Sequence, residues 1–491
     1  MSWLPTLLAP KPEAKRGAPV FFANTLTGKR ELFSPLRAGS VLMYSCGPTV
    51  YSKQHIGNLK APLFADLIAR VLSQAGYRVK RVINITDVGH LQSDGDEGED
   101  KMEVGAKREG LRAGDIAERY TKMFLDDIEA IGLDTSEIRF PRATDYIKEQ
   151  IAMVKALEER GYTYKTLDGI YFDTSKFAAY GKLGNISPLH SREEALAGIG
   201  RRITENKEKR QPADFALWKL TPPGVKREQE WSSPWGLGFP GWHIECSAMA
   251  KALLGVELDI HTGGIDHIPV HHNNEIAQSE SANGKPLARF WMHEAFVNVA
   301  DEKISKSLGN DVYLSDIIER GYRPLALRYF FLQAHYRTQV SFTWEALEAA
   351  NGALTRLYRL AEKIKAEARG RTKVSDTSRR MLALLHDDLA TPQALALLWE
   401  TVRDEDMDRA EQLAVIETAD SVLGLDLLSG GQAKVSVEIP SPIQALVHER
   451  EIARQNGDFA RSDALRVHIA SSGYLVEDGP DGAIVTRKEG R

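Results

Sequence analysis

Four residues of metal-binding types lie in separate parts of the chain: Cys46, Cys246, His271 and Glu275. His271 and Glu275 are four positions apart, so on a helix they would share one face and reach the same ion. Each cysteine stands near a predicted strand–helix junction, a partly open and electropositive position that favours the thiolate. A lone cysteine is more often a small core residue, and a His/Glu pair is more often a surface hydrogen bond. The residue types alone therefore leave both interpretations open.

Two short motifs, about half the chain apart, each follow a predicted apolar strand. The first is His55-Ile56-Gly57-Asn58, which leads into a helix, and the second is Lys303-Ile304-Ser305-Lys306-Ser307, in a loop of Lys, Ser and Gly. Either motif alone would be weak, and the two lysines alone would be best explained as solvated loop residues. Together, in this order, they resemble the HIGH and KMSKS signatures of class I aminoacyl-tRNA synthetases, which bind ATP between the two halves of a Rossmann-like sheet.

Longer segments resemble one family of this class, the cysteinyl-tRNA synthetases. These segments are residues 46–51 (CGPTVY), 84–87 (NITD), 212–219 (PADFALWK), 241–247 (GWHIECS) and 271–278 (HHNNEIAQ). The similarity runs from about residue 20 to residue 350 and continues more weakly to the C-terminus. In that family the positions matching Cys46, Cys246, His271 and Glu275 bind one zinc ion that holds the substrate thiolate. A purely structural zinc is the competing interpretation.

A zinc ion at these residues would solve a selectivity problem. Cysteine and serine have nearly the same shape, and a pocket that reads shape alone separates such substrates by only about 1–3 kcal/mol. Zinc binds sulfur far better than a hydroxyl and lowers the pKa of a thiol. The metal would then act as the specificity filter, and no editing domain would be needed. Substrate binding requires an exchangeable ligand position, and Glu275, the hardest ligand, is the candidate to loosen.

The resemblance also implies roles for the two motifs in a reaction of cysteine with ATP and Mg²⁺. His55 would donate to phosphate oxygens, and Gly57 would leave room for the adenine ring. Asn58 replaces the final histidine of the signature and still offers a donor. Lys303 and Lys306 would neutralise charge that develops on the pyrophosphate.

Three further residues are candidates for the amino-acid pocket. Thr86 and Trp242 match positions that line this pocket in the family, and His261 falls near the predicted zinc helix. Each has a core-packing alternative of comparable weight. The chain departs from the family pattern at His267, Pro269-Val270 and Asn273. These departures leave the four ligands in place but are expected to affect ATP affinity or the geometry of the zinc helix.

The pattern between residues 40 and 85 predicts the element that positions the first motif. Apolar residues recur every four positions after Asn58, which predicts one helix with a broad apolar face, and Gly76 predicts its end. Short β-rich runs stand on both sides of this helix. Such a strand–helix–strand unit is typical of parallel α/β sheets, which bind ligands at the carboxyl ends of their strands.

The predicted fold class is α/β, with a Rossmann-like catalytic domain, an inserted connective segment, a helical stem-contact domain and a small C-terminal anticodon-binding module. The expected boundaries are 1–18 (tail), 19–140 and 214–310 (the two catalytic halves), 141–213 (insertion), 311–428 (helical domain), 429–441 (linker) and 442–491 (C-terminal module). Helices are expected near 117–131, 144–161, 324–334, 344–368, 375–389, 392–401 and 407–422.

Composition is that of an ordinary globular protein, with 43% hydrophobic and 27% charged residues among 491 and a net charge of −5. The sequence contains no run of about 18 apolar residues, the length that would predict a membrane span. Its two cysteines are 200 residues apart, which favours a reducing cytoplasm. The expected partners are tRNA(Cys), L-cysteine and ATP, and a monomer is expected. Two alternatives stay open: a ligase that joins cysteine to an aminosugar in mycothiol synthesis, and an inactive zinc-containing RNA-binding paralogue.

Overall fold

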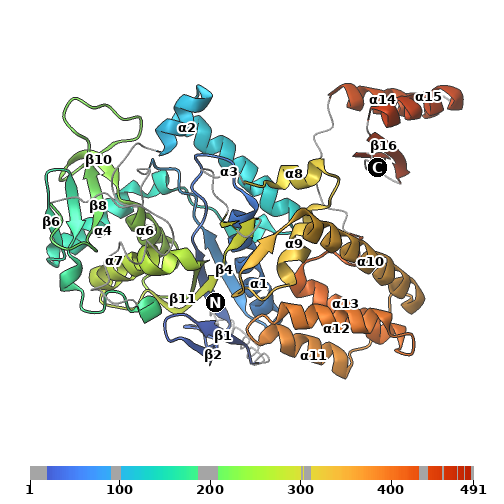
Figure 1. Cartoon of the computed structure of the whole chain (residues 1–491), viewed down its shortest axis with the longest axis horizontal. Coiled ribbons are helices and arrows are strands. Elements are labelled where there is room, and N and C mark those ends of the chain that lie inside the picture. Colours follow the sequence, from blue (N-terminus) through green and yellow to red (C-terminus); the bar gives the residue numbers. More distant parts are fainter. Residues whose placement is uncertain are drawn as a thin grey trace, which may run out of the picture. The chain divides into compact units, whose positions relative to one another are not determined.

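The parallel sheet that the sequence predicts is present and forms the centre of the fold (Figure 1). In this computed structural model its five strands run in the spatial order β12-β11-β3-β4-β5, and all neighbours are parallel. The strands are β3 (Ser40–Ser45), β4 (Arg78–Ile83), β5 (Ile138–Arg139), β11 (Leu258–Gly264) and β12 (Ala288–Glu294). The chain runs outward from β3 in one direction and from β11 in the other. The topological switch point therefore lies between β3 and β11, where open α/β sheets bind ligands.

The structure describes residues 19–89, 101–185, 208–299, 302–303, 311–430, 441–455, 458–472, 474–479 and 482–487. The expected N-terminal tail and Lys306 lie outside these residues. The chain divides into two units. One comprises Met1–Tyr313 with Leu325–Gly431, and the other comprises Leu314–Pro324 with Gln432–Arg491.

Helix α1 (Ile56–Gln74) connects β3 to β4, as the apolar repeat predicts. Ile56, Leu59, Leu63 and most apolar residues beyond them are buried. The helix ends two residues before Gly76, whose φ of +87° belongs to the left-handed region that favours glycine. Three more helices connect strands of this sheet. Helices α2 (Lys101–Glu109) and α3 (Ala113–Ala130) lie between β4 and β5 in the chain, and α7 (Asn273–Asn283) lies between β11 and β12.

The segment between β5 and β11 contains a second, antiparallel sheet with the order β6-β7-β8-β10-β9. Its elements are α4 (Ile147–Glu159), β6 (Thr163–Lys165), β7 (Gly169–Phe172), β8 (Phe215–Leu220), β9 (Trp231–Ser233), β10 (Gly236–Pro240) and α6 (Trp242–Leu254). This antiparallel sheet extends beyond residue 213, where the sequence analysis expects the insertion to end. β8 pairs with β7, and β10 pairs with β8, so the insertion continues to about Pro240.

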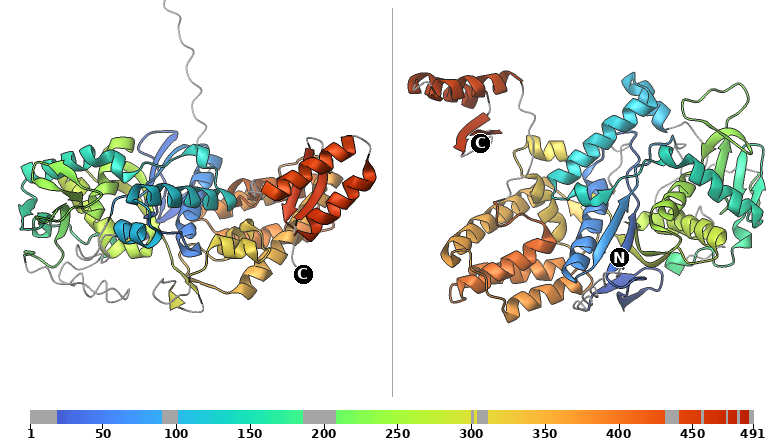
Figure 2. Two further views of the ribbon diagram at one scale, coloured as in Figure 1. Left: turned by 90° about the horizontal axis from the view of Figure 1, so that it is seen from above. Right: turned by 180° about the vertical axis from the view of Figure 1, so that it is seen from behind.

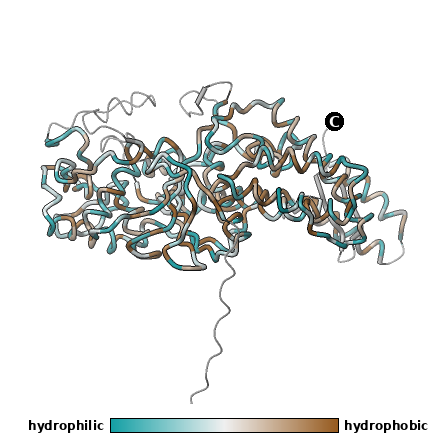
Figure 3. The backbone as a smooth tube through the Cα atoms, turned by 90° about the horizontal axis from the view of Figure 1, so that it is seen from below, coloured by the Kyte–Doolittle hydropathy of each residue, from teal (hydrophilic) through white to brown (hydrophobic). Residues whose placement is uncertain are grey.

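Helices dominate the chain beyond the sheet, close to the predicted ranges. They are α9 (Pro324–Leu332), α10 (Trp344–Ala368), α11 (Asp376–His386), α12 (Thr391–Arg403) and α13 (Arg409–Leu423). Helices α11, α12 and α13 contact one another and lie side by side in the right-hand view of Figure 2. Hydrophobic and hydrophilic segments alternate along the described chain (Figure 3), as expected where each helix buries one face.

Short strands complete the first unit. One pair is the hairpin of β1 (Phe21–Asn24) and β2 (Lys29–Leu32), and three more strands form a sheet in the order β14 (Glu302–Lys303), β13 (Val297–Val299) and β15 (Val340–Phe342). The second unit holds α8 (Leu314–Glu319), α14 (Ser441–Gln455), α15 (Phe459–Ser471) and the antiparallel pair β16 (Tyr474–Gly479) and β17 (Gly482–Arg487). Among the described helices, none combines the length and hydropathy that crossing a membrane requires.

Candidate metal centre and nucleotide site

The four predicted metal ligands meet in one cage. One ligand atom from each of Cys46, Cys246, His271 and Glu275 lies within 4.8 Å of every other. His271 Nε2 is 3.0 Å from Glu275 Oε1, and Cys46 Sγ is 3.6 Å from the same oxygen. Two thiols, an imidazole and a carboxylate are ligands that zinc accepts in tetrahedral sites. The residues present therefore fit a zinc ion.

Three different elements bring these ligands together. Cys46 directly follows β3 at the carboxyl end of the sheet, and Cys246 lies in the second turn of α6. His271 belongs to a single π-helical turn (Ile268–His272) that runs directly into α7, which carries Glu275. The i, i+4 spacing of His271 and Glu275 thus brings their side chains together, as predicted. The expectation that both cysteines are partly open is wrong for Cys246, which is buried because α6 packs against the sheet core.

Burial and mutual contacts set the charges of the cage. Burial raises the pKa of the Cys46 thiol. The pKa of the Cys246 thiol is lowered to about 7, chiefly by the hydrogen bond between Cys46 and Cys246. Burial opposes a charged His271, but the Glu275 carboxylate outweighs this effect and raises the imidazole pKa to about 10. The Glu275 pKa is lowered despite burial because His261 and His271 both face the carboxylate. The negative Glu275 carboxylate and the positive His271 imidazolium thus compensate each other inside the cage.

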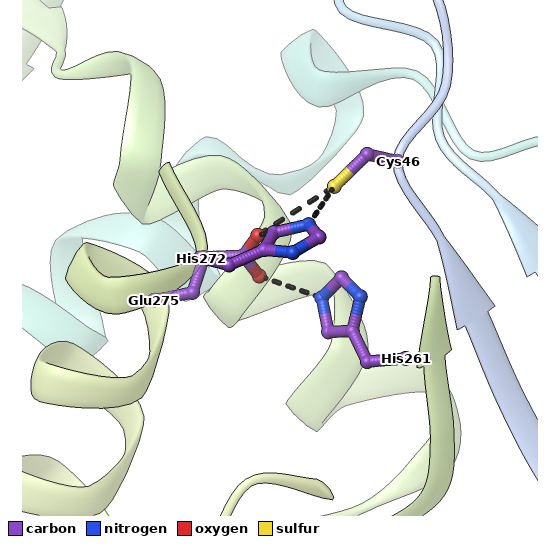
Figure 4. A group of neighbouring side chains, drawn as sticks. All are labelled: Cys46, His261, His272 and Glu275. Atoms are coloured by element: carbon purple, nitrogen blue, oxygen red, sulfur yellow. Dashed lines mark hydrogen bonds and ion pairs between the residues drawn. The ribbon is translucent and has the colours of Figure 1, made fainter. Parts of the chain in front are cut away.

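Two histidines hold the cage from a second side (Figure 4). His261 Nε2 is 3.0 Å from Glu275 Oε2, and His272 Nε2 is 3.3 Å from Cys46 Sγ. With Cys46 and Glu275 they form a second set of ligand-type atoms within 4.8 Å of one another. His261 had been expected here as a substrate residue. His272 was missed, although its place beside His271 and three positions before Glu275 was a usable signal.

The other two expected pocket residues also border the cage. Thr86 Oγ1 accepts a hydrogen bond from Asn84 Nδ2 (3.0 Å) and donates one to Glu245 Oε2 (3.3 Å). Asn84 Oδ1 in turn lies 3.7 Å from Cys246 Sγ. The Trp242 ring is tilted against the imidazole of His271, with 4.8 Å between ring centroids. His261 and Trp242 therefore contact the candidate ligands directly, and Thr86 is linked to Cys246 through Asn84.

The departures from the family pattern lie around the π-helical turn. Asn273 donates to the carbonyls of Leu183 (3.1 Å) and Ile268 (2.7 Å), so it fixes the start of α7. The His267 ring lies about 5 Å from the rings of His271 and His272. Beside these residues, His271 and Glu275 lie within hydrogen-bonding distance of each other.

The first phosphate motif stands at the start of α1, at the same edge of the sheet. His55 is the N-cap residue, and Gly57 and Asn58 lie in the first turn. Unpaired backbone N–H groups and the helix dipole make such an end suited to anions. Lys303 lies in β14, in register with Asn298, and Lys306 lies outside the described residues. The structure thus places the first motif at the switch point and leaves the role of the lysine motif as a prediction.

Gly47 connects Cys46 to the neighbouring strand through close backbone packing. A Cβ added to Gly47 would overlap the carbonyl oxygen of Asn84. We therefore expect Gly47→Ala to displace Cys46 and to lower the zinc content of the purified protein severalfold, measured by metal analysis. Gly114→Ala is the matched control, because a Cβ there meets no atom within 4 Å. Equal zinc content in both variants would contradict this expectation.

The fold and the site together define a class I aminoacyl-tRNA synthetase. Residues 32–352 match the family model described as "tRNA synthetases class I (C) catalytic domain". The fold is similar to Mycobacterium tuberculosis methionyl-tRNA synthetase bound to methionyl-adenylate, with a TM-score of 0.53, 16% identity and coverage of 80% of this chain and 92% of that one. An Agrobacterium radiobacter leucyl-tRNA synthetase in a tRNA complex gives a TM-score of 0.58 at 10% identity, covering 82% and 86%.

Within this class, the chain belongs to the cysteine–tRNA ligase family. It is 48% identical to cysteine–tRNA ligase 1 of Burkholderia lata over 92% of this chain and 93% of that protein. It is 43% identical to cysteine–tRNA ligase of Novosphingobium aromaticivorans over 96% and 97%. Residues 436–485 match the cysteinyl-tRNA ligase anticodon binding domain. The resemblance inferred from the motifs is confirmed.

Proposed function

We propose that this protein activates L-cysteine with ATP and transfers the cysteinyl group to the 3′ end of tRNA(Cys). The observation that carries the proposal is the cage of two thiols, an imidazole and a carboxylate, placed at the switch point beside the N-terminus of α1. Family membership supports a ligase that uses tRNA, an amino acid and ATP. The cage supports cysteine as the amino acid.

In the first step, a carboxylate oxygen of cysteine attacks the α-phosphorus of ATP, the bond to the bridging oxygen breaks, and pyrophosphate leaves. His55 and the backbone N–H groups at the start of α1 bind the phosphates. Gly57 and Asn58 hold the nucleotide against the same turn, and Lys303 and Lys306 neutralise the leaving pyrophosphate, with Mg²⁺ accompanying ATP. In the second step, a hydroxyl of the terminal ribose attacks the carbonyl carbon, and AMP leaves.

Cys46, Cys246, His271 and Glu275 would hold one Zn²⁺. The zinc ion, when bound, supplies a soft Lewis acid that favours a thiolate over a hydroxyl. Thr86, Trp242 and His261 border the cage and would orient the rest of the substrate. The contact of His261 with Glu275 gives this carboxylate a second partner within 3.0 Å, which supports Glu275 as the ligand that yields to the incoming thiolate.

The domain assignment follows the same proposal. The parallel sheet and its insertion form the catalytic domain, helices α9–α13 contact the tRNA stem, and residues 442–491 read the anticodon. The match of residues 436–485 to an anticodon binding domain argues against the aminosugar ligase, whose family normally lacks this region. The intact cage and the retained His55 argue against an inactive RNA-binding paralogue.

The test is charging of a tRNA(Cys) transcript with labelled cysteine by zinc-replete protein. We expect cysteine to be attached and labelled serine to be rejected. A transcript of another tRNA serves as the control for specificity. Absence of charging by correctly folded protein would contradict the proposal, and an aminosugar acceptor would then be the next substrate to offer.

A further inference from the structure

Glu294 is a buried carboxyl group that the mechanism above does not use. It is the last residue of β12, at the carboxyl end of the parallel sheet, in register with Gly264 at the end of β11. Its exposed fraction is only 5%, and its Oε2 atom has no hydrogen-bond partner among the described residues. An unpartnered buried carboxyl oxygen is costly, and in native proteins it calls for an explanation such as an absent ligand.

The surroundings of Glu294 do not supply that partner. Lys60, from α1, is also buried, but its ammonium group donates to the Ala295 carbonyl at 2.7 Å. Burial raises the pKa of Glu294 to about 8, and the nearby Lys60 offsets only part of this rise. The charge of Lys60 is thus nearby while the carboxyl oxygen still lacks a donor.

A second carboxyl group converges on the same point. A Cβ added to Gly264 would contact the Asp266 carboxylate and would lie 3.5 Å from Glu294 Oε1. The carboxyl groups of Asp266 and Glu294 therefore lie on either side of the space that a Cβ of residue 264 would fill. Paired acceptors of this kind match two neighbouring hydroxyl groups better than they match a single amine.

The position relative to α1 decides which part of a nucleotide these acceptors would meet. The N-terminus of α1 follows β3 and attracts the phosphates. Glu294 stands two strands away from β3, beyond β11, and therefore away from the helix end that suits the phosphates. A nucleotide with its phosphates at α1 would direct its nucleoside half toward β11 and β12.

We propose that Glu294 recognises the ribose of ATP, accepting a hydrogen bond from a ribose hydroxyl on its free carboxyl oxygen, beside Asp266. This inference rests on the proposed function and adds a sugar-specificity residue to it. Glu294 would distinguish ribonucleotides from deoxyribonucleotides during cysteine activation.

The test uses the full-length, zinc-replete protein in cysteine-dependent ATP–pyrophosphate exchange with ATP, 2′-deoxyATP and 3′-deoxyATP. Glu294→Met keeps the size of the side chain and removes the acceptor. We expect it to raise KM for ATP about tenfold, the typical effect of one lost hydrogen bond to a partly charged group. KM should stay unchanged for the analogue that lacks the partner hydroxyl, and for cysteine. Glu294→Gln retains an acceptor oxygen and should recover most of the affinity.

Two controls separate ribose binding from a structural role. Lys60→Met removes the neighbouring charge and should not change the ratio of KM for ATP to KM for the deoxy analogues. Glu257→Ala removes a carboxyl group at the surface and should leave KM for all three nucleotides unchanged. Removing an unpaired buried carboxyl should leave the melting temperature of Glu294→Met unchanged or raised. An equal rise in KM for all three nucleotides, or a parallel loss of stability and cysteine affinity, would overturn the inference. Wild-type protein without any exchange would instead contradict the proposed function, and calorimetric binding of ATP and its deoxy analogues would still test Glu294.

Discussion

Cys246→Ser is expected to lower cysteine activation by about 100-fold or more, while ATP binding changes severalfold at most. The thiol of Cys246 is one of four ligand-type atoms within 4.8 Å of one another, and a serine hydroxyl is a far weaker ligand for zinc. Even changes to groups that merely orient a ligand cost about 10- to 100-fold in metal affinity. The measurements are zinc per chain by metal analysis, KM for cysteine in pyrophosphate exchange, and ATP binding by calorimetry.

Lys251→Ser is the matched control for this variant. Lys251 is exposed on the same helix, α6, so the control introduces the same side chain outside the cage. We expect it to keep one zinc ion per chain and normal activation. Equal losses of cysteine and ATP binding in Cys246→Ser would point to a structural zinc and would contradict a metal that selects the substrate thiolate.

Asp66→Asn is expected to destabilise the protein by about 3–5 kcal/mol, because it breaks a buried ion-pair network. Asp66 Oδ2 accepts hydrogen bonds from Arg70 (2.7 Å) and Arg328 (2.8 Å), and Oδ1 accepts one from Arg81 (3.1 Å). Arg328 is fully buried and also donates to the Leu423 carbonyl at 2.6 Å. The network thus joins α1, which carries the phosphate motif, to α9 and to the end of α13. Urea denaturation at pH 7 would measure the loss.

The same carboxylate predicts a definite acid sensitivity. Burial alone would raise the pKa of Asp66, but Arg328, Arg70 and Arg81 outweigh it and lower the pKa to about 2. A lowered folded-state pKa contributes stability that is present above the unfolded value of about 4 and is lost as the pH falls toward 2. The difference in the free energy of unfolding between wild type and Asp66→Asn should therefore shrink as the pH falls from about 4 to about 2.

Asp126→Asn provides the comparison for an ion pair at the surface. Asp126 pairs with Lys122 one turn away on α3, and both side chains are exposed. Such pairs contribute about 0.3–0.5 kcal/mol. A loss in Asp66→Asn no larger than in Asp126→Asn would show that the buried network does not stabilise the junction of α1, α9 and α13.

Local patterns were sufficient where neighbours in sequence act together. The four-residue repeat after Asn58 and the stop at Gly76 gave α1 nearly to its ends. The spacing of His271 and Glu275 placed both ligands on one helical face, because one helical turn brings such residues together. The expected ranges of α10 to α13 lie close to the observed ones. These features depend on backbone geometry over a few residues, which the sequence encodes directly.

The second sheet shows where local patterns failed. β8 had been assigned to the resumed catalytic core, yet it pairs with β7, more than 40 residues earlier in the chain. Every residue of β8 except the last is buried. Such a run suits either sheet equally well, because burial on both faces gives the same apolar run in a parallel core and in a covered antiparallel sheet. Strand pairing between distant segments decided the outcome.

The sequence by itself determined the class of protein, the α/β fold, and a group of four metal-binding residue types that the structure brings into one cage, since motifs and periodicities require only the identity and order of residues. The tertiary structure alone decided that His261 and His272 support Glu275 and Cys46, that Cys246 is buried, and that Glu294 meets Asp266 across Gly264. The physical reason is that burial and convergence of charges arise from contacts between distant segments. Spacing along the chain carries no record of those contacts.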